Sequence, residues 1–428
     1  MTHRIAVVGT GYVGLTTGAY LAHLGHDVVC ADVVPEKVER LNRGDVPILE
    51  TGLDELVEEG LRSERLRFVL GAATAAAGAE FVFLCVQTPQ GEDGSADLTY
   101  IRQAAAEIGP VLASESIVIN KSTVPVGSTR VVEEALGRSD VFVVSNPEFL
   151  REGSAVHDCL NPDRIVIGAD DQAAAMRVAT LFESLKAPLV ITDPASAETI
   201  KYASNAFLAT KVSFVNALAN VCEAVGADVR EVVLGMGYDK RIGFEFLRPG
   251  PGWGGSCFPK DTRAMVHIAE DHGYDFDLLR GVIAVNEEQY ERMAAKVERM
   301  VGGSVAGCKV AALGVTFKAR TDDLRDSPAI EVLRRLRDRG AASIRAYDPG
   351  VPVGRKVLDG VEMMADAYAA CEGADVVVVL TEWDDFRWLD FAKLAGLMGS
   401  PRIVDTRNLL EPAAVRRRGF VYDAIGRS

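Results

Sequence analysis

Three glycines in the spacing G-x-G-x-x-G constrain the fold of this chain more than any other feature. An apolar run, Ile5–Val8, indicates a buried strand; Gly9, Gly11 and Gly14 follow it, and Leu15–Leu24 has the pattern of a helix. In this context the spacing is typical of a dinucleotide-binding βαβ unit. Gly9 allows the tight turn, Gly11 lets a pyrophosphate approach the helix, and Gly14 lets helix and strand pack closely. A doubly wound α/β domain is therefore predicted.

The end of the next predicted strand indicates which dinucleotide binds. Asp27–Ala31 is the second strand, and it ends at Asp32, with Lys37 five residues further on. A carboxylate at this place accepts hydrogen bonds from the adenosine ribose and repels a 2′-phosphate, so NAD is favoured over NADP. Lys37 lies within reach of the same ribose. A glycine-rich turn without a ligand is the alternative, but it does not account for the strand, the helix and the acid together.

The alternation of strands and helices continues along the first half of the chain. Further strands are expected at 80–86, 116–120, 140–144, 164–168 and 188–191. Thr88 follows the first of these, Thr123 the second, and Glu148 and Glu152 the third. Parallel sheets bind ligands at the carboxyl ends of their strands, so Thr123 and both glutamates are placed to face a nicotinamide. The glutamates are open to a second interpretation, as solvated acids at the start of a helix.

A long helical pattern follows, from Ala195 to Val225, and Gly226 marks its end. The pattern is longer than an ordinary globular helix, so it is expected to connect two halves of the chain and to offer a surface for oligomerisation. Lys201 and Asn205 are four residues apart and share one face of this helix. Lys201 indicates either a desolvated functional amine or a surface lysine with a buried stem.

The segment Pro249–Asp261 has too many prolines and glycines for a helix or strand interior, so a loop is predicted. Cys257 lies in it, with Lys260 and Asp261 close behind. A thiol is a nucleophile only as the thiolate, and a nearby cation raises the thiolate fraction. The segment therefore indicates a ligand-binding loop that presents a nucleophile. A glycine-rich connection with an ordinary buried cysteine is the alternative.

A second α/β pattern begins after Gly302. Strands are expected at 309–314, 343–347, 375–380 and 402–404, with a helix at 329–339. Lys318, Arg325 and Arg407 lie on strand ends or loops and suit phosphate groups, although most such side chains are surface charges. The expected fold is two Rossmann-like doubly wound domains joined by a long central helix and a helical dimerisation region. The expected boundaries are 1–195, 196–300 and 301–428.

Charge and cysteine content exclude several classes of function. A formal net charge of -15 argues against binding to nucleic acids or anionic membranes. The seven cysteines include no C-x-x-C pair, so neither a metal site nor a redox motif is indicated. No apolar run reaches membrane-spanning length, and no signal-peptide pattern opens the sequence. These features favour a cytoplasmic protein with reduced thiols.

A hydride acceptor and a reactive thiol together indicate one kind of chemistry. An aldehyde cannot lose hydride to become an acid until its carbon is tetrahedral. Addition of Cys257 gives a thiohemiacetal, loss of hydride leaves a thioester, and water then releases a carboxylate. The residues fit a two-step oxidation of an alcohol to an acid that needs no metal.

Several motifs, in this order along the chain, carry a family resemblance: Gly9–Gly14, Lys121–Gly127, Asn146–Gly153, Gly254–Asp261 and Phe317–Lys318. They resemble the UDP-glucose/GDP-mannose dehydrogenase family, and most of all its UDP-glucose branch, from the first strand to Arg407. The resemblance implies that UDP-glucose, two NAD⁺ and water become UDP-glucuronate and two NADH without release of the aldehyde. It also implies two Rossmann-like domains joined by a long helix that builds a homodimer.

The resemblance assigns catalytic roles residue by residue. Cys257 matches the nucleophile, Asp261 the partner for the base role, and Lys201 the cation that stabilises an oxyanion. Thr123 with Glu148 resembles the pair that positions water for thioester hydrolysis. The implied catalytic set is Cys257, Lys201, Asn205, Asp261, Thr123 and Glu148.

The resemblance also assigns binding residues. Cofactor contacts match Gly9, Gly11, Val13, Gly14, Asp32, Lys37, Thr88, Thr123, Glu152, Lys260 and Arg325. Substrate contacts match Glu148, Phe149, Leu150, Arg151, Glu152, Lys201, Asn205, Phe246, Leu247, Arg248, Pro249, Gly250, Gly254, Lys318 and Arg407. Arg241 matches an arginine that reaches the substrate across the dimer.

Two departures from the family pattern bear on the sugar. Trp253 stands where a smaller aromatic is usual, beside the sugar, and Thr406 stands where glycine is common. GDP-mannose and a UDP-N-acetylhexosamine are therefore alternative substrates. A non-catalytic NAD-binding scaffold is an alternative of another class, and the intact Cys257, Lys260 and Asp261 argue against it.

Overall fold

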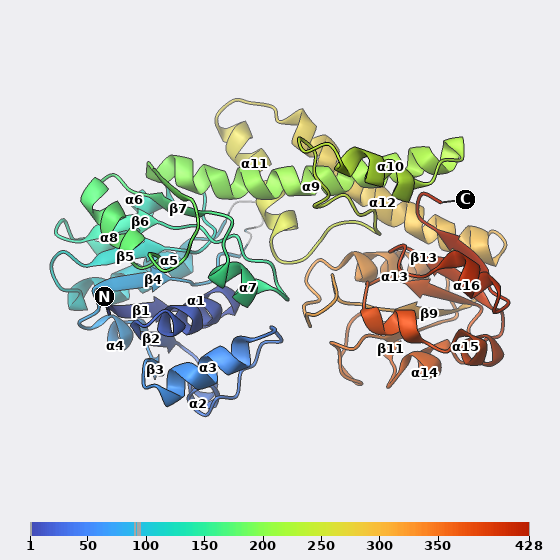
Figure 1. The fold of residues 1–428 in the computed structure, drawn as a ribbon, viewed down its shortest axis with the longest axis horizontal. Helices are drawn as coiled ribbons and strands as arrows, with labels where there is room; N and C mark the ends of the chain where they lie inside the picture. The colour runs from blue at the N-terminus through green and yellow to red at the C-terminus, as the bar shows by residue number, and fades with distance from the viewer. Residues whose placement is uncertain (1, 90, 92–95, 428) are drawn as a thin grey trace. The chain divides into compact units, whose positions relative to one another are not determined.

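The computed structural model describes residues 2–89, 91 and 96–427, which form two compact units, Met1–Ser204 and Asn205–Ser428 (Figure 1). Each unit is built on its own sheet. The division between them falls inside one continuous helix, α9 (Pro194–Val225), which the sequence predicted one residue shorter. No helix among the described residues is both long enough and apolar enough to cross a membrane.

An eight-stranded sheet organises the first unit, in the order β3-β2-β1-β4-β5-β6-β7-β8. Its strands are β1 Arg4–Val8, β2 Asp27–Asp32, β3 Leu66–Leu70, β4 Phe81–Leu84, β5 Ile117–Asn120, β6 Phe142–Ser145, β7 Ile165–Gly168 and β8 Leu189–Thr192. Neighbouring strands are parallel except β6 and β7, which pair antiparallel through Ser145 and Gly168. The strands predicted for this unit are present, and β3 was not among them.

Helices cover both faces of this sheet, as a doubly wound fold requires. They are α1 Tyr12–His23, α2 Pro35–Asn42, α3 Leu53–Arg62, α4 Ala72–Ala76, α5 Thr99–Ile108, α6 Ser128–Leu136, α7 Ala155–Leu160 and α8 Gln172–Thr180, with a 3₁₀ turn η1 at Gly109–Val111. Successive strand residues point to opposite faces. Phe81 and Phe83 therefore join the core that includes α1 and α3, whereas Val82 and Leu84 join the core that includes α5 and α6.

A six-stranded parallel sheet organises the second unit, in the order β11-β10-β9-β12-β13-β14. Its strands are β9 Lys309–Leu313, β10 Ser343–Tyr347, β11 Val361–Met363, β12 Val376–Val379, β13 Arg402–Asp405 and β14 Val421–Ala424. Its helices after α9 are α10 Val229–Gly237, α11 Phe258–Asp271, α12 Asp277–Val301, α13 Pro328–Asp338, α14 Ala367–Cys371, α15 Phe391–Leu397 and α16 Pro412–Arg416, with η2 at Asp384–Trp388. The prediction of two parallel-sheet α/β domains is confirmed.

The loop predicted for Pro249–Asp261 ends earlier than expected. Helix α11 begins at Phe258, and Cys257 is its N-cap. Pro259 does not oppose this, because a proline in the first turn lacks only an N–H that has no partner within the helix. Lys260 and Asp261 therefore lie in the first turn of a helix rather than in a loop.

Candidate active site

The glycine turn between β1 and α1 has the shape that the sequence predicted. Gly9 has φ +97°, and a Cβ built on it would lie 2.6 Å from the carbonyl oxygen of Cys85. A Cβ on Gly14 would lie 1.9 Å from the carbonyl oxygen of Gly9. A Cβ on Gly11, by contrast, would meet nothing within 4 Å. Gly9 and Gly14 are thus required by packing, and Gly11 leaves open the start of α1, where a pyrophosphate would approach.

Substitutions at these glycines should separate binding from folding. We expect Gly11→Val to fold normally, because the site is open, but to weaken NAD binding about tenfold or more, which is about 1.4 kcal/mol. We expect Gly14→Val to lower the free energy of unfolding by about 1–3 kcal/mol, because β1 and α1 must move apart. Thermal unfolding and NAD titration of both variants measure these effects. Wild-type NAD affinity in Gly11→Val would contradict the assignment.

Asp32, at the end of β2, has an ionised carboxylate that can accept hydrogen bonds from a ligand. Its carboxylate accepts hydrogen bonds from the Thr10 hydroxyl and from the Val33 amide, the latter at 2.8 Å, and its Oδ2 lies 2.9 Å from Lys37 Nζ. Partial burial raises the pKa of Asp32, but hydrogen bonds from Thr10 and Lys37 outweigh it and hold the pKa below its usual value. The carboxylate is therefore ionised where the ribose is expected.

Two predicted cofactor residues meet at neighbouring strand ends. The Thr88 hydroxyl donates to the Thr123 carbonyl oxygen at 2.7 Å, which joins the loop after β4 to the loop after β5. Val13 lies in the first turn of α1 and is half-buried. Glu152 is half-buried as well.

Glu148 and Lys201 form a buried ion pair. Lys201 Nζ lies 2.7 Å from Glu148 Oε1, and the side chains are only 4% and 6% exposed, respectively. The other carboxylate oxygen accepts from the Leu150 amide at 2.7 Å. Burial raises the pKa of Glu148, but the charge and hydrogen bond of Lys201 outweigh it and lower the pKa. Two alternatives left open by the sequence are therefore wrong: Glu148 is not a solvated acid, and Lys201 is not a surface lysine.

Two further charged residues in this unit are buried, although the sequence analysis assigns neither of them a role in the site. Lys121 is 6% exposed and donates to Asn146 Oδ1 at 3.1 Å; burial lowers its pKa. Glu50 is 4% exposed and accepts from the amides of Gly153 and Ala155 at 2.6 and 2.8 Å. It also accepts from the Tyr12 hydroxyl, so it ties the glycine turn to the loop that follows Glu148. Only the three-dimensional contacts reveal these links.

In the second unit, Asp261, in the first turn of α11 after Cys257, contacts Asn205 and Lys260 and forms a polar cluster with them. Asp261 is fully buried; it accepts from Asn205 Nδ2 at 2.6 Å and lies 3.0 Å from Lys260 Nζ. Cys257 is half-buried at the start of α11, and its Sγ lies 3.5 Å from Ser256 Oγ. The positive end of a helix dipole favours an anion at this position. The structure thus brings four sequence-predicted residues together: Cys257, Lys260, Asp261 and Asn205.

The loop before Cys257 packs against the strand ends of the second sheet. A Cβ on Gly254 would lie 1.9 Å from the Asp326 carbonyl oxygen, and one on Gly250 would lie 3.2 Å from Arg407 Nη1. Arg407 itself donates to the carbonyl oxygens of Leu380 at 2.8 Å and Phe317 at 3.1 Å. Arg407 therefore contacts both the loop before Cys257, at Gly250, and Phe317, the residue before Lys318.

Three segments of the chain match the models of one protein family. Residues 3–186 match the NAD binding domain of the UDP-glucose/GDP-mannose dehydrogenase family, 195–288 its central domain, and 311–412 its UDP binding domain. The chain belongs to this family. The expected family and the expected cofactor, NAD, are both confirmed.

Members of this dehydrogenase family resemble the chain over its full length. The UDP-glucose 6-dehydrogenase of Rhizobium meliloti (strain 1021) is 46% identical, with 99% of each chain covered. UDP-glucose 6-dehydrogenase TuaD of Bacillus subtilis (strain 168) is 44% identical, over 99% of this chain and 93% of TuaD. A UDP-glucose dehydrogenase structure from Pyrobaculum islandicum superposes with a TM-score of 0.90 at 38% identity, over 100% of this chain and 98% of the other.

Three residues to which the family resemblance gives a place at the site, Arg241, Arg325 and Trp253, make other contacts in this structure. Arg241 and Arg325 are exposed, and each pairs with an acid two residues before it, Asp239 at 2.6 Å and Asp323 at 2.7 Å. Trp253 is 6% exposed and donates from Nε1 to Ser213 Oγ at 2.8 Å, so its ring belongs to the core beneath the loop.

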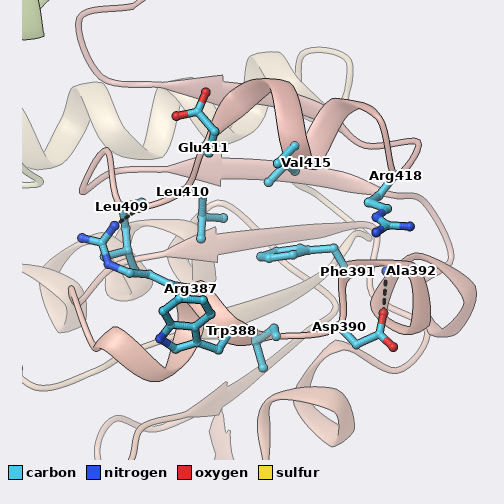
Figure 2. A pocket seen from close by; sticks show the side chains of 12 residues that line it. Arg387, Trp388, Asp390, Phe391, Ala392, Leu409, Leu410, Glu411, Val415 and Arg418 are labelled. Atoms are coloured by element: carbon cyan, nitrogen blue, oxygen red, sulfur yellow. Dashed lines mark hydrogen bonds between the residues drawn. The ribbon is translucent and has the colours of Figure 1, made fainter.

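A cavity of about 720 Å³ in the second unit contains none of the residues that the family pattern assigns (Figure 2). It is lined by Arg387, Trp388, Leu389, Asp390, Phe391, Ala392, Leu409, Leu410, Glu411, Ala414, Val415 and Arg418. These residues come from η2, α15, α16 and the segments beside them.

Proposed function

We propose that this protein oxidises C6 of UDP-glucose twice and forms UDP-glucuronate with reduction of two NAD⁺. The observation that carries the proposal is the Cys257 cluster: a half-buried thiol at a helix start, above a buried carboxylate that accepts from Asn205 and pairs with Lys260. The curated relatives at 43–46% identity over the full length are named UDP-glucose 6-dehydrogenases. Both supports point to the same chemistry.

The two oxidations can be written as successive steps, each with a named residue of this chain. Asp261 takes up the proton released from the C6 hydroxyl as a hydride leaves that carbon. The Cys257 thiolate then adds to the aldehyde carbon, and the resulting oxyanion is stabilised by Lys201. Loss of a second hydride gives a thioester on Cys257. Bound NAD⁺ supplies the hydride acceptor in both oxidations.

Thioester hydrolysis is assigned to the strand-end loops of the first unit. Thr123 and Glu148 position the water. Its oxygen bonds to the acyl carbon, Cys257 leaves as the thiolate, and the two protons of the water are released to solvent as the carboxylate forms. The ionised state of Glu148 suits the acceptance of a hydrogen bond from that water. We assign binding of the UDP group to the cations Lys318 and Arg407. We also assign NAD binding to residues 1–195, catalysis to residues 196–300 and UDP binding to residues 301–428.

A panel of nucleotide sugars tests the substrate. We expect two NADH per UDP-glucose consumed, and little NADH with GDP-mannose or a UDP-N-acetylhexosamine. A UDP-N-acetylhexosamine is the main alternative substrate, because the structure of a UDP-D-ManNAc dehydrogenase from Pyrococcus horikoshii superposes with a TM-score of 0.88 at 28% identity. NADH formed only with another sugar would reject UDP-glucose. No NADH with any sugar, together with unprotected labelling of Cys257 by iodoacetamide, would favour a scaffold.

We propose that α9 pairs with a second copy of this chain. Phe207, Phe214 and Val221 recur every seven residues on this helix and are 65%, 54% and 55% exposed. Side chains seven apart lie on one face, and exposed apolar stripes of this kind pair helices. We therefore assign a homodimer that buries this stripe, consistent with an Arg241 that extends into solvent within its own chain.

Phe214→Glu should convert the dimer to a monomer. A charge in the middle of the stripe must be desolvated on association, which costs more than the apolar contact contributes. Sedimentation velocity measures the result. Trp388→Glu is the control, since Trp388 is 84% exposed but lies on η2 rather than α9. An unchanged sedimentation coefficient for Phe214→Glu would reject this interface.

We place the protein in the cytoplasm. All seven cysteines are free thiols, and five of them are buried. A mechanism that depends on a free thiolate at Cys257 requires a reducing compartment, because oxidation would remove the nucleophile.

A further inference from the structure

Glu198 is a buried acid to which the reaction scheme gives no role. It lies near the start of α9 and is 2% exposed. Its Oε2 accepts from the Gly127 amide at 2.6 Å, and its Oε1 accepts from the Thr129 amide at 3.0 Å and the Thr129 hydroxyl at 2.8 Å. All three hydrogen bonds go to one short segment, residues 127–129.

These bonds fall on the start of α6. That helix begins at Ser128, and its N-cap, Gly127, has no side chain to satisfy the first free amides. Glu198 supplies the missing acceptor from another helix, and a negative charge there is also favoured by the helix dipole. Burial raises the pKa of Glu198 above its usual value, and the hydrogen bonds from Thr129 and Gly127 offset this only in part. Glu198 thus fixes the end of the loop that begins at Lys121.

Thr123 lies in that same loop, between two anchors. On one side the Thr88 hydroxyl holds the Thr123 carbonyl oxygen at 2.7 Å, and the Ser122 hydroxyl donates to Val86 at 2.7 Å. On the other side Glu198 holds Gly127 and the first turn of α6. Without Glu198, the second end would keep the hydrogen bond from the Ser128 hydroxyl to the Pro125 carbonyl oxygen, at 2.7 Å, but would lose the three bonds that join it to α9.

Glu198 and Lys201 are three residues apart on α9 and share a face. Lys201 pairs with Glu148 from the loop after β6, while Glu198 holds the loop after β5. One turn of one helix therefore holds both loops that carry the water-positioning pair. We propose that Glu198 is a positioning residue that keeps Thr123 and Glu148 in register for thioester hydrolysis. This inference rests on the proposed function.

Pre-steady-state kinetics of Glu198→Ala tests the role. The two hydride transfers precede hydrolysis, so we expect the early burst of NADH to keep its wild-type amplitude. Because misplacement of a catalytic group by about 1 Å can cost on the order of 100-fold, we expect the steady-state rate to fall by about 10- to 100-fold. The acyl group should then accumulate on Cys257, where intact-protein mass spectrometry detects it. Glu198→Gln, which keeps one acceptor oxygen, should lie between the two.

The controls separate positioning from folding and from the proposed function. Glu183→Gln changes an exposed glutamate of the same unit and should behave as wild type. A burst and a steady-state rate that fall together in Glu198→Ala and Glu198→Gln would mean fewer folded sites and would overturn the role. Unchanged rates in both variants would overturn it as well. Failure of the proposed function would look different, since the wild type itself would then release no NADH with UDP-glucose.

Discussion

We expect Cys257→Ser to abolish steady formation of the acid and to leave nucleotide binding intact. A serine hydroxyl is not ionised near neutral pH, so it cannot capture the aldehyde as the thiolate does. We expect the steady-state rate of NADH formation to fall by on the order of 10⁴-fold or more. Calorimetric titration should give wild-type affinity for NAD and for UDP-glucose, because Cys257 is half-buried and the substitution changes one atom.

The matched control is Cys308→Ser, the other half-buried cysteine, which lies outside the cluster of Asp261 and Asn205. It should retain full activity. Iodoacetamide should inactivate the wild type, UDP-glucose should slow the inactivation, and Cys308→Ser should respond in the same way. Sustained production of UDP-glucuronate by Cys257→Ser would rule out the covalent scheme.

We expect Lys201→Met to lower the free energy of unfolding by about 3–5 kcal/mol at neutral pH. The substitution removes the partner at 2.7 Å and leaves the Glu148 carboxylate buried without its counter-charge. In the wild type, Lys201 helps to hold the pKa of Glu148 below its ordinary value. Such a carboxylate contributes stability above its unfolded pKa of about 4.3, and that contribution is lost as pH falls through the lower folded pKa.

The variant should therefore show the opposite dependence on pH. Without Lys201, burial raises the pKa of Glu148, so Lys201→Met is penalised at neutral pH and less so as the acid takes up a proton. Urea unfolding between pH 4 and 8 should show the gap from wild type narrowing towards acid. Adding Glu148→Gln to Lys201→Met should recover part of the loss, as a double-mutant cycle would measure. A gap that does not depend on pH would contradict the ion-pair account.

Local sequence patterns were enough to predict those parts of the site that a single segment of the chain forms. The turn from Gly9 to Gly14 depends on φ and on close packing within one βα unit, and Asp32 is only a strand away. The fold class follows similarly from alternating apolar runs. The start of α11 differs from the prediction because a high content of proline and glycine does not exclude a helix start: Pro259 lies in the first turn, where a proline suits a helix.

Burial and long-range partners could not be predicted in this way. Glu148 and Lys201 are 53 residues apart, and neither the acid nor the lysine carries a local signal that it will be desolvated. Glu198 lies 71 residues from Gly127 and Glu50 lies 103 residues from Gly153, so their capping roles exist only in the folded chain. The reversed direction of β7 likewise follows from the path of the chain after β6 rather than from its apolar pattern.

The boundary between the two compact units has a practical consequence because it lies within α9. Limited proteolysis usually separates domains at exposed linkers, but here the bond after Ser204 is helical, and Tyr202 and Asn205 beside it are buried. Truncation at that bond would leave a frayed helix end whose last carbonyl oxygens have no partner, with Lys201 in the fraying turn. A cut beyond Val225 is no better, because Ala219 and Cys222 of α9 belong to a core of the second unit; the helix is therefore shared, and neither half can be separated without loss of packing.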